Sequence, residues 1–285
     1  QETDARGFRG IGRLAGLAYC QELVFHSKTK EEDTVNVLTW DCRKLKSLLV
    51  DPKIKSGLAD IVSQATKSER FKATSETDKH FFKVEMKKIL RIKNDVLLNA
   101  SLIEQYLSQV APVHFSDDFK FKEQIRSHLN KYFILQEHNI FVGENKVLRR
   151  FRNHFEFSTK VTDYFTEFEE IKVVDNDEKL LAVGFLLHHS YYGAINRTAD
   201  IAGLRARSGN IQIGTNVLFL DLYPEQRFNA WTIGEIHVLS DKLVPNGRRD
   251  DFEKSNQYYN FLNYVSLITK RVSDICRQKS LQRNQ

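Results

Sequence analysis

Three glycines precede a helix-forming run in Gly7-Phe8-Arg9-Gly10-Ile11-Gly12-Arg13-Leu14-Ala15-Gly16-Leu17-Ala18-Tyr19-Cys20, the stretch that decides the fold. Glycine takes positive φ at little steric cost and lets the backbone approach a ligand closely. The first N–H groups of a following helix have no intrahelical partner, and the helix dipole favours an anion beside them. The stretch predicts a phosphate-binding turn that leads into a helix over residues 11–20, with Arg9 and Arg13 adding positive charge.

The spacing alone leaves a plain structural alternative open. Glycines in this pattern also occur where a helix and a sheet pack closely against each other, without any ligand.

The run that follows this stretch, Glu22-Leu23-Val24-Phe25-His26-Ser27-Lys28, supports the phosphate interpretation through a resemblance. Together the two resemble the second glycine box of the GHKL ATPases and the strand after it. That superfamily includes the ninety-kilodalton heat-shock chaperones, the MutL-type proteins, type II topoisomerases and the microrchidia ATPases. The resemblance implies that this box closes over the β- and γ-phosphates of ATP at the end of a mobile lid. The residues that it implies are Gly7, Phe8, Arg9, Gly10, Ile11 and Gly12.

A second resemblance lies near the other end of the chain. Gly203-Leu204-Arg205-Ala206-Arg207 is followed, after a Pro-Glu-x-Arg-Phe stretch and another strand, by Leu243-Val244-Pro245-Asn246-Gly247-Arg248-Arg249-Asp250-Asp251-Phe252-Glu253. This order is similar to the middle domain of the ninety-kilodalton chaperones, where a loop arginine reaches the γ-phosphate. The match places Arg249 on that arginine, with Arg248 beside it. A guanidinium there stabilises the charge that spreads over the γ-oxygens during phosphoryl transfer.

The same loop has a structural alternative. Pro-Asn-Gly at residues 245–247 is strong turn chemistry. In this interpretation Asp250 and Asp251 pair with Arg248 and Arg249 and cap the final helix.

Two further boxes of the GHKL site are missing from this sequence. One is a helix with a Glu that positions water and an Asn that holds Mg²⁺, and the other is an Asp-x-Gly-x-Gly loop that recognises adenine. The resemblance therefore implies ATP and Mg²⁺ as cofactors, with the magnesium and adenine contacts supplied from outside this chain. We expect a fragment of a chaperone-like ATPase that does not hydrolyse ATP by itself.

Composition describes a soluble globular chain. It has 285 residues, of which 41% are hydrophobic and 28% charged, enough for one large or two ordinary domains. The start is polar and is not a signal peptide, and no apolar run is long enough to span a membrane. Cys20, Cys42 and Cys276 have no metal-ligand spacing and predict free thiols in a reducing cytoplasm.

The net charge of +6 is compatible with nucleic-acid contact, although no long basic run is present. The excess is clearest at the end of the chain, at Lys270, Arg271, Arg277, Lys279 and Arg283. Nucleic acid is therefore a weaker alternative partner. We expect protein clients, a homodimer formed through segments outside this chain, and no membrane contact.

The predicted fold class is α+β, with an α/β second part. Residues 1–115 are expected to be the C-terminal part of a GHKL ATP-binding domain, a partial Bergerat-type sandwich with helices on one face of an antiparallel or mixed sheet. Residues 116–285 are expected to be a transducer-like middle domain with a mixed sheet and a long final helix. The boundary near residue 116 follows from the resemblance of residues 102–115 to the exit of the chaperone ATPase domain.

Local patterns predict the elements of the first part. Residues 23–27 and 34–40 predict a β-hairpin, and Asp41 predicts the N-cap of a helix over residues 42–49. Residues 53–79 predict a weak helix and a surface loop. A strand ending near Ile89 is expected to bury Phe82, Val84, Met86 and Lys88, and a helix to bury Leu98, Leu102, Tyr106 and Val110.

Similar patterns predict the second part. Phe121, Ile125 and Leu129 predict a helix, and the residues of the final helix recur every three or four positions, at Tyr258, Leu262, Val265, Ile268, Val272 and Ile275. The predicted strands cover residues 140–142, 170–174, 180–187, 204–207, 210–213 and 233–239. His188, His189, Phe228 and Trp231 are interpreted as core or strand-edge residues.

Two other functions remain alternatives. One is a protein-binding or scaffold module without catalysis. The other is a DNA-transaction ATPase of the microrchidia or MutL type, because Gly-Phe-Arg-Gly is shared with that branch.

Overall fold

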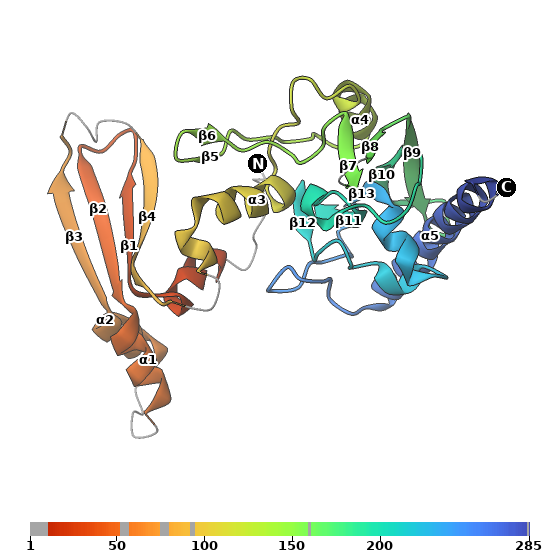
Figure 1. The fold of residues 1–285 in the computed structure, drawn as a ribbon. Helices are drawn as coiled ribbons and strands as arrows, with labels where there is room; N and C mark the ends of the chain where they lie inside the picture. The colour runs from red at the N-terminus through yellow and green to blue at the C-terminus, as the bar shows by residue number, and fades with distance from the viewer. Residues whose placement is uncertain (1–10, 52–56, 75–79, 92–94, 159–160, 284) are drawn as a thin grey trace. The chain divides into compact units, whose positions relative to one another are not determined.

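The computed structural model describes residues 11–51, 57–74, 80–91, 95–158, 161–283 and 285 (Figure 1). The chain divides into two compact units, Gln1–Leu98 and Asn99–Gln285. Each unit has its own sheet and its own hydrophobic core. Among these residues no helix has the length and apolar character needed to cross a membrane.

The first unit is built on an antiparallel sheet in the order β3-β2-β1-β4. Its strands are β1 (Cys20–Lys28), β2 (Thr34–Asp41), β3 (Thr66–Lys72) and β4 (Phe81–Ile89), and its helices are the 3₁₀-helix η1 (Ile11–Ala18), α1 (Cys42–Val50), α2 (Leu58–Ala65) and the 3₁₀-helix η3 (Val96–Leu98). Leu14, Leu45 and Val62 from three of these helices pack with Leu23 and Trp40 of the sheet. The predicted sheet with helices on one face is confirmed.

Three local predictions for this unit are corrected. The predicted helix over residues 11–20 is a 3₁₀-helix that ends at Ala18, so Cys20 already belongs to β1. Residues 66–72, predicted as surface loop, form the edge strand β3. Phe82 and Val84 are 61% and 46% exposed, because the helices cover only the end of the sheet near Leu23 and Trp40.

Asp41 caps α1 as predicted. Its Oδ1 accepts a hydrogen bond from the Lys44 N–H at 2.9 Å, and its own backbone is extended (φ −81°, ψ 96°). We expect Asp41→Ala to lower the free energy of unfolding of the first unit by about 1 kcal/mol. Asp41→Asn should retain most of this stabilisation, because asparagine is also a good N-cap residue. Urea unfolding followed by Trp40 fluorescence measures both. An equal loss for the two variants would contradict the capping role.

The second unit contains a mixed sheet in the order β12-β11-β13-β10-β9, in which only the β11–β13 pair is parallel. The sheet strands are β9 (Glu167–Val174), β10 (Leu180–His188), β11 (Gly203–Ser208), β12 (Ile211–Ile213) and β13 (Ile233–Val238). Two hairpins, β5 (Phe141–Val142) with β6 (Asn145–Lys146) and β7 (His154–Ser158) with β8 (Val161–Tyr164), lie outside it. The helices are α3 (Ala100–Val110), α4 (Lys122–Asn130), α5 (Asn256–Arg283) and the 3₁₀-turns η4 (Arg197–Ala199), η5 (Leu220–Leu222) and η6 (Gln226–Trp231).

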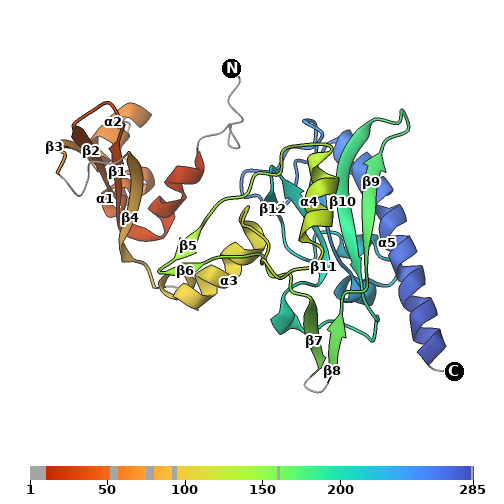
Figure 2. The ribbon, with the colours of Figure 1, turned by 90° about the horizontal axis from the view of Figure 1, so that it is seen from above.

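Helices cover both faces of this sheet (Figure 2). On β10, Ala182 and Leu186 belong to the core that includes Phe261 and Val265 of α5. The alternate side chains of the same strand, such as Phe185, join the core that includes Ile125 of α4. The strand pairing and the length of α5 confirm the predicted mixed sheet and long final helix. The alternation explains why β10 is apolar along its whole length.

Helix α3 belongs to the second unit, so the division between the units falls before it and not near residue 116. Leu107 of α3 packs with Val113 and Val147 of that unit. Leu102 and Tyr106, predicted to be buried, are 37% and 60% exposed, and Leu107 makes the apolar contact of this helix instead.

Candidate functional site

The predicted glycine site lies largely outside the described residues. Gly7, Phe8, Arg9 and Gly10 are not described, and of Ile11 only the backbone, at the start of η1, is described. Gly12 and Gly16 are not at positive φ, so the conformational reason expected for glycine does not apply at these two positions. A Cβ at Gly16 would lie 2.9 Å from Leu23 Cδ1, whereas one at Gly12 would meet no atom within 4 Å. Close packing on β1 therefore explains Gly16.

The second predicted site, the loop over residues 246–250, is held by hydrogen bonds within itself and to the end of β12. The Arg249 N–H donates to the Asn246 carbonyl at 3.1 Å, and the Arg249 carbonyl accepts from the Gly214 N–H at 2.8 Å. The chain segments on either side of the loop are also hydrogen-bonded to each other. The Asn246 N–H donates to the Asp251 carbonyl at 2.9 Å, and the Glu253 N–H donates to the Val244 carbonyl at 2.8 Å. Arg249 adopts φ +58°, an uncommon conformation for a residue other than glycine. The bracing therefore fixes the backbone from which the Arg249 side chain projects.

The acidic residues of this loop form only some of the contacts that the structural alternative predicted. Asp250 pairs with Arg248 (Nε–Oδ2 3.1 Å), although the Arg248 side chain is 87% exposed, and it accepts a hydrogen bond from Asn246 Nδ2 at 2.6 Å. Asp251 accepts from the Tyr258 hydroxyl at 2.7 Å and pairs with Lys254. Ser255 caps the backbone of the first turn of α5, because its hydroxyl oxygen accepts from the Tyr258 N–H at 3.2 Å.

A buried charged cluster lies on the α4 side of the sheet, and sequence reasoning missed it. Glu235 of β13 lies between two guanidinium groups: its Oε2 is 2.6 Å from Arg149 Nη1, and its Oε1 is 2.8 Å from Arg207 Nε. All three side chains are at most 2% exposed. Arg149 also donates to the Asn210 side chain, and Arg207 donates to the Asn210 carbonyl at 3.0 Å.

This cluster is connected to helix α3. Arg207 Nη2 donates to the Gln109 carbonyl at 2.6 Å, and Arg205 Nη1 donates to Gln109 Oε1 at 3.1 Å. Arg205 lies 3.5 Å from the Asp200 carboxylate, to which Gln109 also donates. The signal in the sequence is the alternation Leu204-Arg205-Ala206-Arg207, in which every second residue of a buried strand is charged.

Burial and neighbouring charges shift the pKa values of the cluster in defined directions. Burial opposes ionisation of Glu235, but Arg149 and Arg207 outweigh it and hold its pKa well below the ordinary value. Burial, with the nearby Arg149, lowers the pKa of Arg207 to about 10. Burial also lowers the pKa of His237 to about 4, despite Glu235 at 3.3 Å. His237 is therefore neutral at pH 7, whereas Glu235 and Arg207 are charged.

The depressed pKa of His237 predicts acid destabilisation. In the unfolded chain this histidine binds a proton below its ordinary pKa of 6.5, whereas in the folded protein it does so only near pH 4. Its contribution to stability is therefore present above pH 6.5 and is lost as the pH falls toward 4. We expect the second unit to lose about 2 kcal/mol of unfolding free energy from this residue between pH 7 and pH 5.

Urea unfolding at the two pH values, for wild type and His237→Gln, measures this contribution. The variant is expected to show a correspondingly smaller loss. An identical pH dependence in both proteins would show that His237 does not titrate in the way described.

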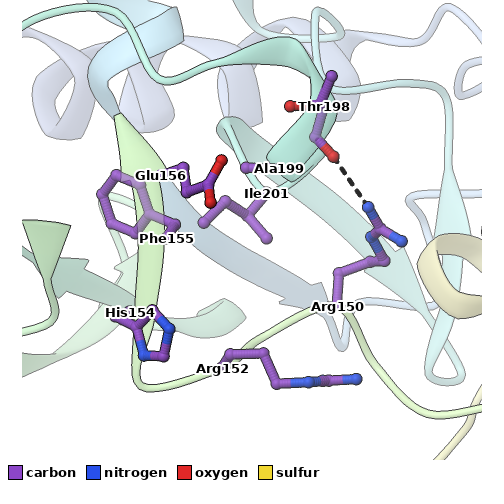
Figure 3. A pocket seen from close by; sticks show the side chains of 8 residues that line it. All are labelled: Arg150, Arg152, His154, Phe155, Glu156, Thr198, Ala199 and Ile201. Atoms are coloured by element: carbon purple, nitrogen blue, oxygen red, sulfur yellow. Dashed lines mark hydrogen bonds between the residues drawn. The ribbon is translucent and has the colours of Figure 1, made fainter. Parts of the chain in front are cut away.

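A separate cavity of about 370 Å³ lies in the second unit (Figure 3). Arg150 and Arg152 line it from the segment before β7, and β7 and η4 supply the rest: His154, Phe155, Glu156, Thr198, Ala199 and Ile201. Arg150 Nη2 donates to the Thr198 carbonyl at 3.0 Å, as the dashed line in Figure 3 marks.

The two adjacent histidines are hydrogen-bonded core residues, in agreement with their interpretation from the sequence. His189 lies with Nδ1 2.9 Å from Asp163 Oδ2 and Nε2 2.9 Å from the Trp231 carbonyl. His188 Nε2 lies 2.8 Å from Glu169 Oε2, and His188 Nδ1 lies 2.6 Å from the Tyr191 hydroxyl oxygen. Across the described ranges, no group of three His, Cys, Asp or Glu side chains has the arrangement of a metal site.

Several of the basic residues near the C-terminus have partners within the protein. Arg271 donates to Glu169 Oε2 at 2.9 Å, and Arg277 contacts both Glu225 and Asp274 at 2.7 Å. Arg283 donates to the Tyr191 carbonyl. The carboxylate partners of Arg271 and Arg277 reduce the positive charge that these two residues offer to a polyanion.

Comparisons with known proteins show only a distant likeness to solved structures. No protein-family model matches the sequence, and no curated protein matches it. Among solved structures, the chain is similar to the ATPase and transducer domains of DNA topoisomerase II from Balamuthia mandrillaris, with a TM-score of 0.42 and 11% sequence identity. The alignment covers 98% of this chain and 66% of that one, just under two thirds of its length. Topoisomerase activity belongs to that protein, and the functional argument for this chain comes from its own residues.

Proposed function

We propose that this chain is part of a GHKL ATPase related to the ninety-kilodalton heat-shock chaperones, and that Arg249 contacts the γ-phosphate of ATP. The glycine stretch at residues 7–12 would bind the phosphates through its backbone N–H groups. Protein clients and a homodimer formed through segments outside this chain belong to the same proposal.

The observation that carries the proposal is the braced conformation of Arg249. Its N–H and its carbonyl are both hydrogen-bonded, to Asn246 and to Gly214, so the backbone that bears the guanidinium is fixed. A cation that is positioned before the reaction stabilises developing negative charge without reorganising during it. Keeping a residue other than glycine at φ +58° costs free energy, which is common where a loop positions a functional side chain.

The described residues fit one part of an ATP site and not another. The guanidinium groups of Arg248 and Arg249 are suited in charge and geometry to phosphate oxygens. Among the described residues, no group of three or more His, Cys, Asp or Glu side chains is arranged to hold a metal ion. The Glu/Asn helix and the Asp-x-Gly-x-Gly loop are also absent from the sequence, so the proposal requires another segment to supply the metal ligand, the water-positioning Glu and the adenine contact.

The test is ATP turnover by the complete protein, together with its Arg249→Ala variant. Turnover that does not depend on Arg249 would reject the assigned role. The absence of any ATP binding by the complete protein would reject the ATPase class itself and would favour the scaffold alternative.

A further inference from the structure

We propose that the cavity beside Arg150 and Arg152 binds a small organic monophosphate, with the arginines holding the phosphate and the apolar wall holding the body of the molecule. The inference is independent of the ATPase proposal, because the cavity shares no residue with the loop over residues 246–250 or with the glycine stretch.

The charges of Arg150 and Arg152 distinguish them from the neighbouring arginines. Arg149 and Arg207 share the Glu235 carboxylate, and Arg205 lies beside Asp200. In the described part of the chain, neither Arg150 nor Arg152 forms an ion pair with a carboxylate.

Backbone carbonyls hold both guanidinium groups in place. Arg150 donates to Thr198 at 3.0 Å, and Arg152 Nη1 donates to the carbonyls of Arg149 and Phe151 at 2.6 and 2.8 Å. Each guanidinium has five N–H donors, so these contacts leave donors for a ligand. Anchored arginines without a carboxylate in direct contact are suited to phosphate, which accepts two parallel hydrogen bonds from one guanidinium.

The rest of the cavity explains why the phosphate should carry an organic body. Phe155 and Ile201 are 5% and 4% exposed and, with Ala199, form an apolar wall. A volume of about 370 Å³ is near the lower end of the range for small-molecule sites and exceeds what a phosphate ion fills. Figure 3 shows the arginines and this wall around the same space.

Glu156 limits how much negative charge a ligand in the cavity can carry. It is the single carboxylate among the eight lining residues, against two arginines and a histidine. A second or third phosphate group would meet its repulsion, which favours a monophosphate over a di- or triphosphate.

The experiment measures binding of phenyl phosphate to the chain by isothermal titration calorimetry, with inorganic phosphate and phenol as comparison probes. We expect phenyl phosphate to bind more tightly than either comparison probe. Arg150→Ala and Arg152→Ala should each weaken binding about tenfold, which is the value of a charge-assisted hydrogen bond. Glu156→Gln should strengthen it by a few-fold.

Arg197→Ala is the matched control. Arg197 lies on η4 next to Thr198 and is exposed, but it does not line the cavity, so its removal should change the affinity less than twofold. Equal losses for Arg197→Ala and Arg152→Ala would indicate diffuse charge attraction and would overturn the proposal.

Two further outcomes would also overturn it. One is the absence of phenyl phosphate binding up to about 10 mM, and the other is unchanged affinity in both alanine variants. Arg152→Lys keeps the charge and loses the planar guanidinium, so it is expected to bind with intermediate affinity. It provides the test if Arg150→Ala or Arg152→Ala lowers the thermal unfolding midpoint.

Discussion

Replacing Arg249 by alanine is expected to lower the ATP turnover of the complete protein by about 10²–10³-fold, the usual effect of removing one preorganised donor from a transition state. The ATP concentration at half-maximal rate should change much less, because the contact strengthens as charge develops on the γ-oxygens. The braced backbone of residue 249 is the physical reason, since its hydrogen bonds to Asn246 and Gly214 do not involve the side chain and survive the substitution.

Arg248→Ala is the matched control for this prediction. Arg248 is the neighbouring cation, but its side chain is 87% exposed and paired with Asp250, so we expect its loss to lower turnover by only a few-fold. Steady-state turnover of wild type and both variants, at saturating ATP and magnesium, decides between the two residues. Equal effects of the two substitutions would contradict a specific role for Arg249.

Glu235→Gln is expected to destabilise the second unit by about 3–5 kcal/mol, the cost of breaking a buried ion pair. The carboxylate is 1% exposed and lies within 3 Å of both Arg149 and Arg207. Without it, two buried guanidinium groups lose their shared counter-charge, and the amide that replaces it cannot compensate. A loss of this size is a large fraction of the stability of an ordinary domain.

Urea unfolding of the Trp40→Phe background measures this loss, because Trp231 then reports on the second unit alone. Glu225→Gln is the matched control, since Glu225 is 33% exposed and pairs with Arg227 and Arg277 near the surface. That control should cost less than about 1 kcal/mol. If Glu235→Gln lowered the free energy of unfolding no more than the control does, the cluster would not stabilise the second unit.

Elements with strong local signals were predicted correctly from the sequence. The Asp41 cap and the strand pair around Gly209 and Asn210 depend on chemistry within four residues. Both turn residues adopt positive φ, which glycine and asparagine tolerate best, and this fixes the β11–β12 hairpin locally.

Elements that depend on tertiary contacts were missed or misplaced. Thr66–Lys72 is polar on both faces, and only its pairing with β2 makes it a strand. Tyr106 lies at helical spacing with other apolar residues, yet it is 60% exposed, whereas Leu107 is the residue of α3 that packs with Val113 and Val147. Periodicity indicates which residues share a face but does not identify which face will be covered.

The residues of the candidate sites also divide into those that the sequence indicated and those that only the tertiary structure brings together. Arg248 and Arg249 were selected from the sequence through the resemblance of their loop to the chaperone middle domain, and the structure adds the backbone hydrogen bond between Arg249 and Gly214. The Glu235 cluster and the cavity at Arg150 and Arg152 combine residues far apart in the chain, and the alternation at residues 204–207 marks only the part of the cluster that lies on β11. The glycine stretch at residues 7–10 lies outside the described residues and stays a prediction.

The most direct measurement of the central claim compares the affinities of the complete protein for a non-hydrolysable ATP analogue and for ADP, in wild type and in Arg249→Ala. The two nucleotides differ in the γ-phosphate, so their affinity ratio isolates the contact assigned to Arg249. We predict that wild type prefers the ATP analogue and that the substitution reduces this preference about tenfold, leaving ADP affinity unchanged. An affinity ratio that is the same in both proteins would contradict the claim that Arg249 reaches the γ-phosphate.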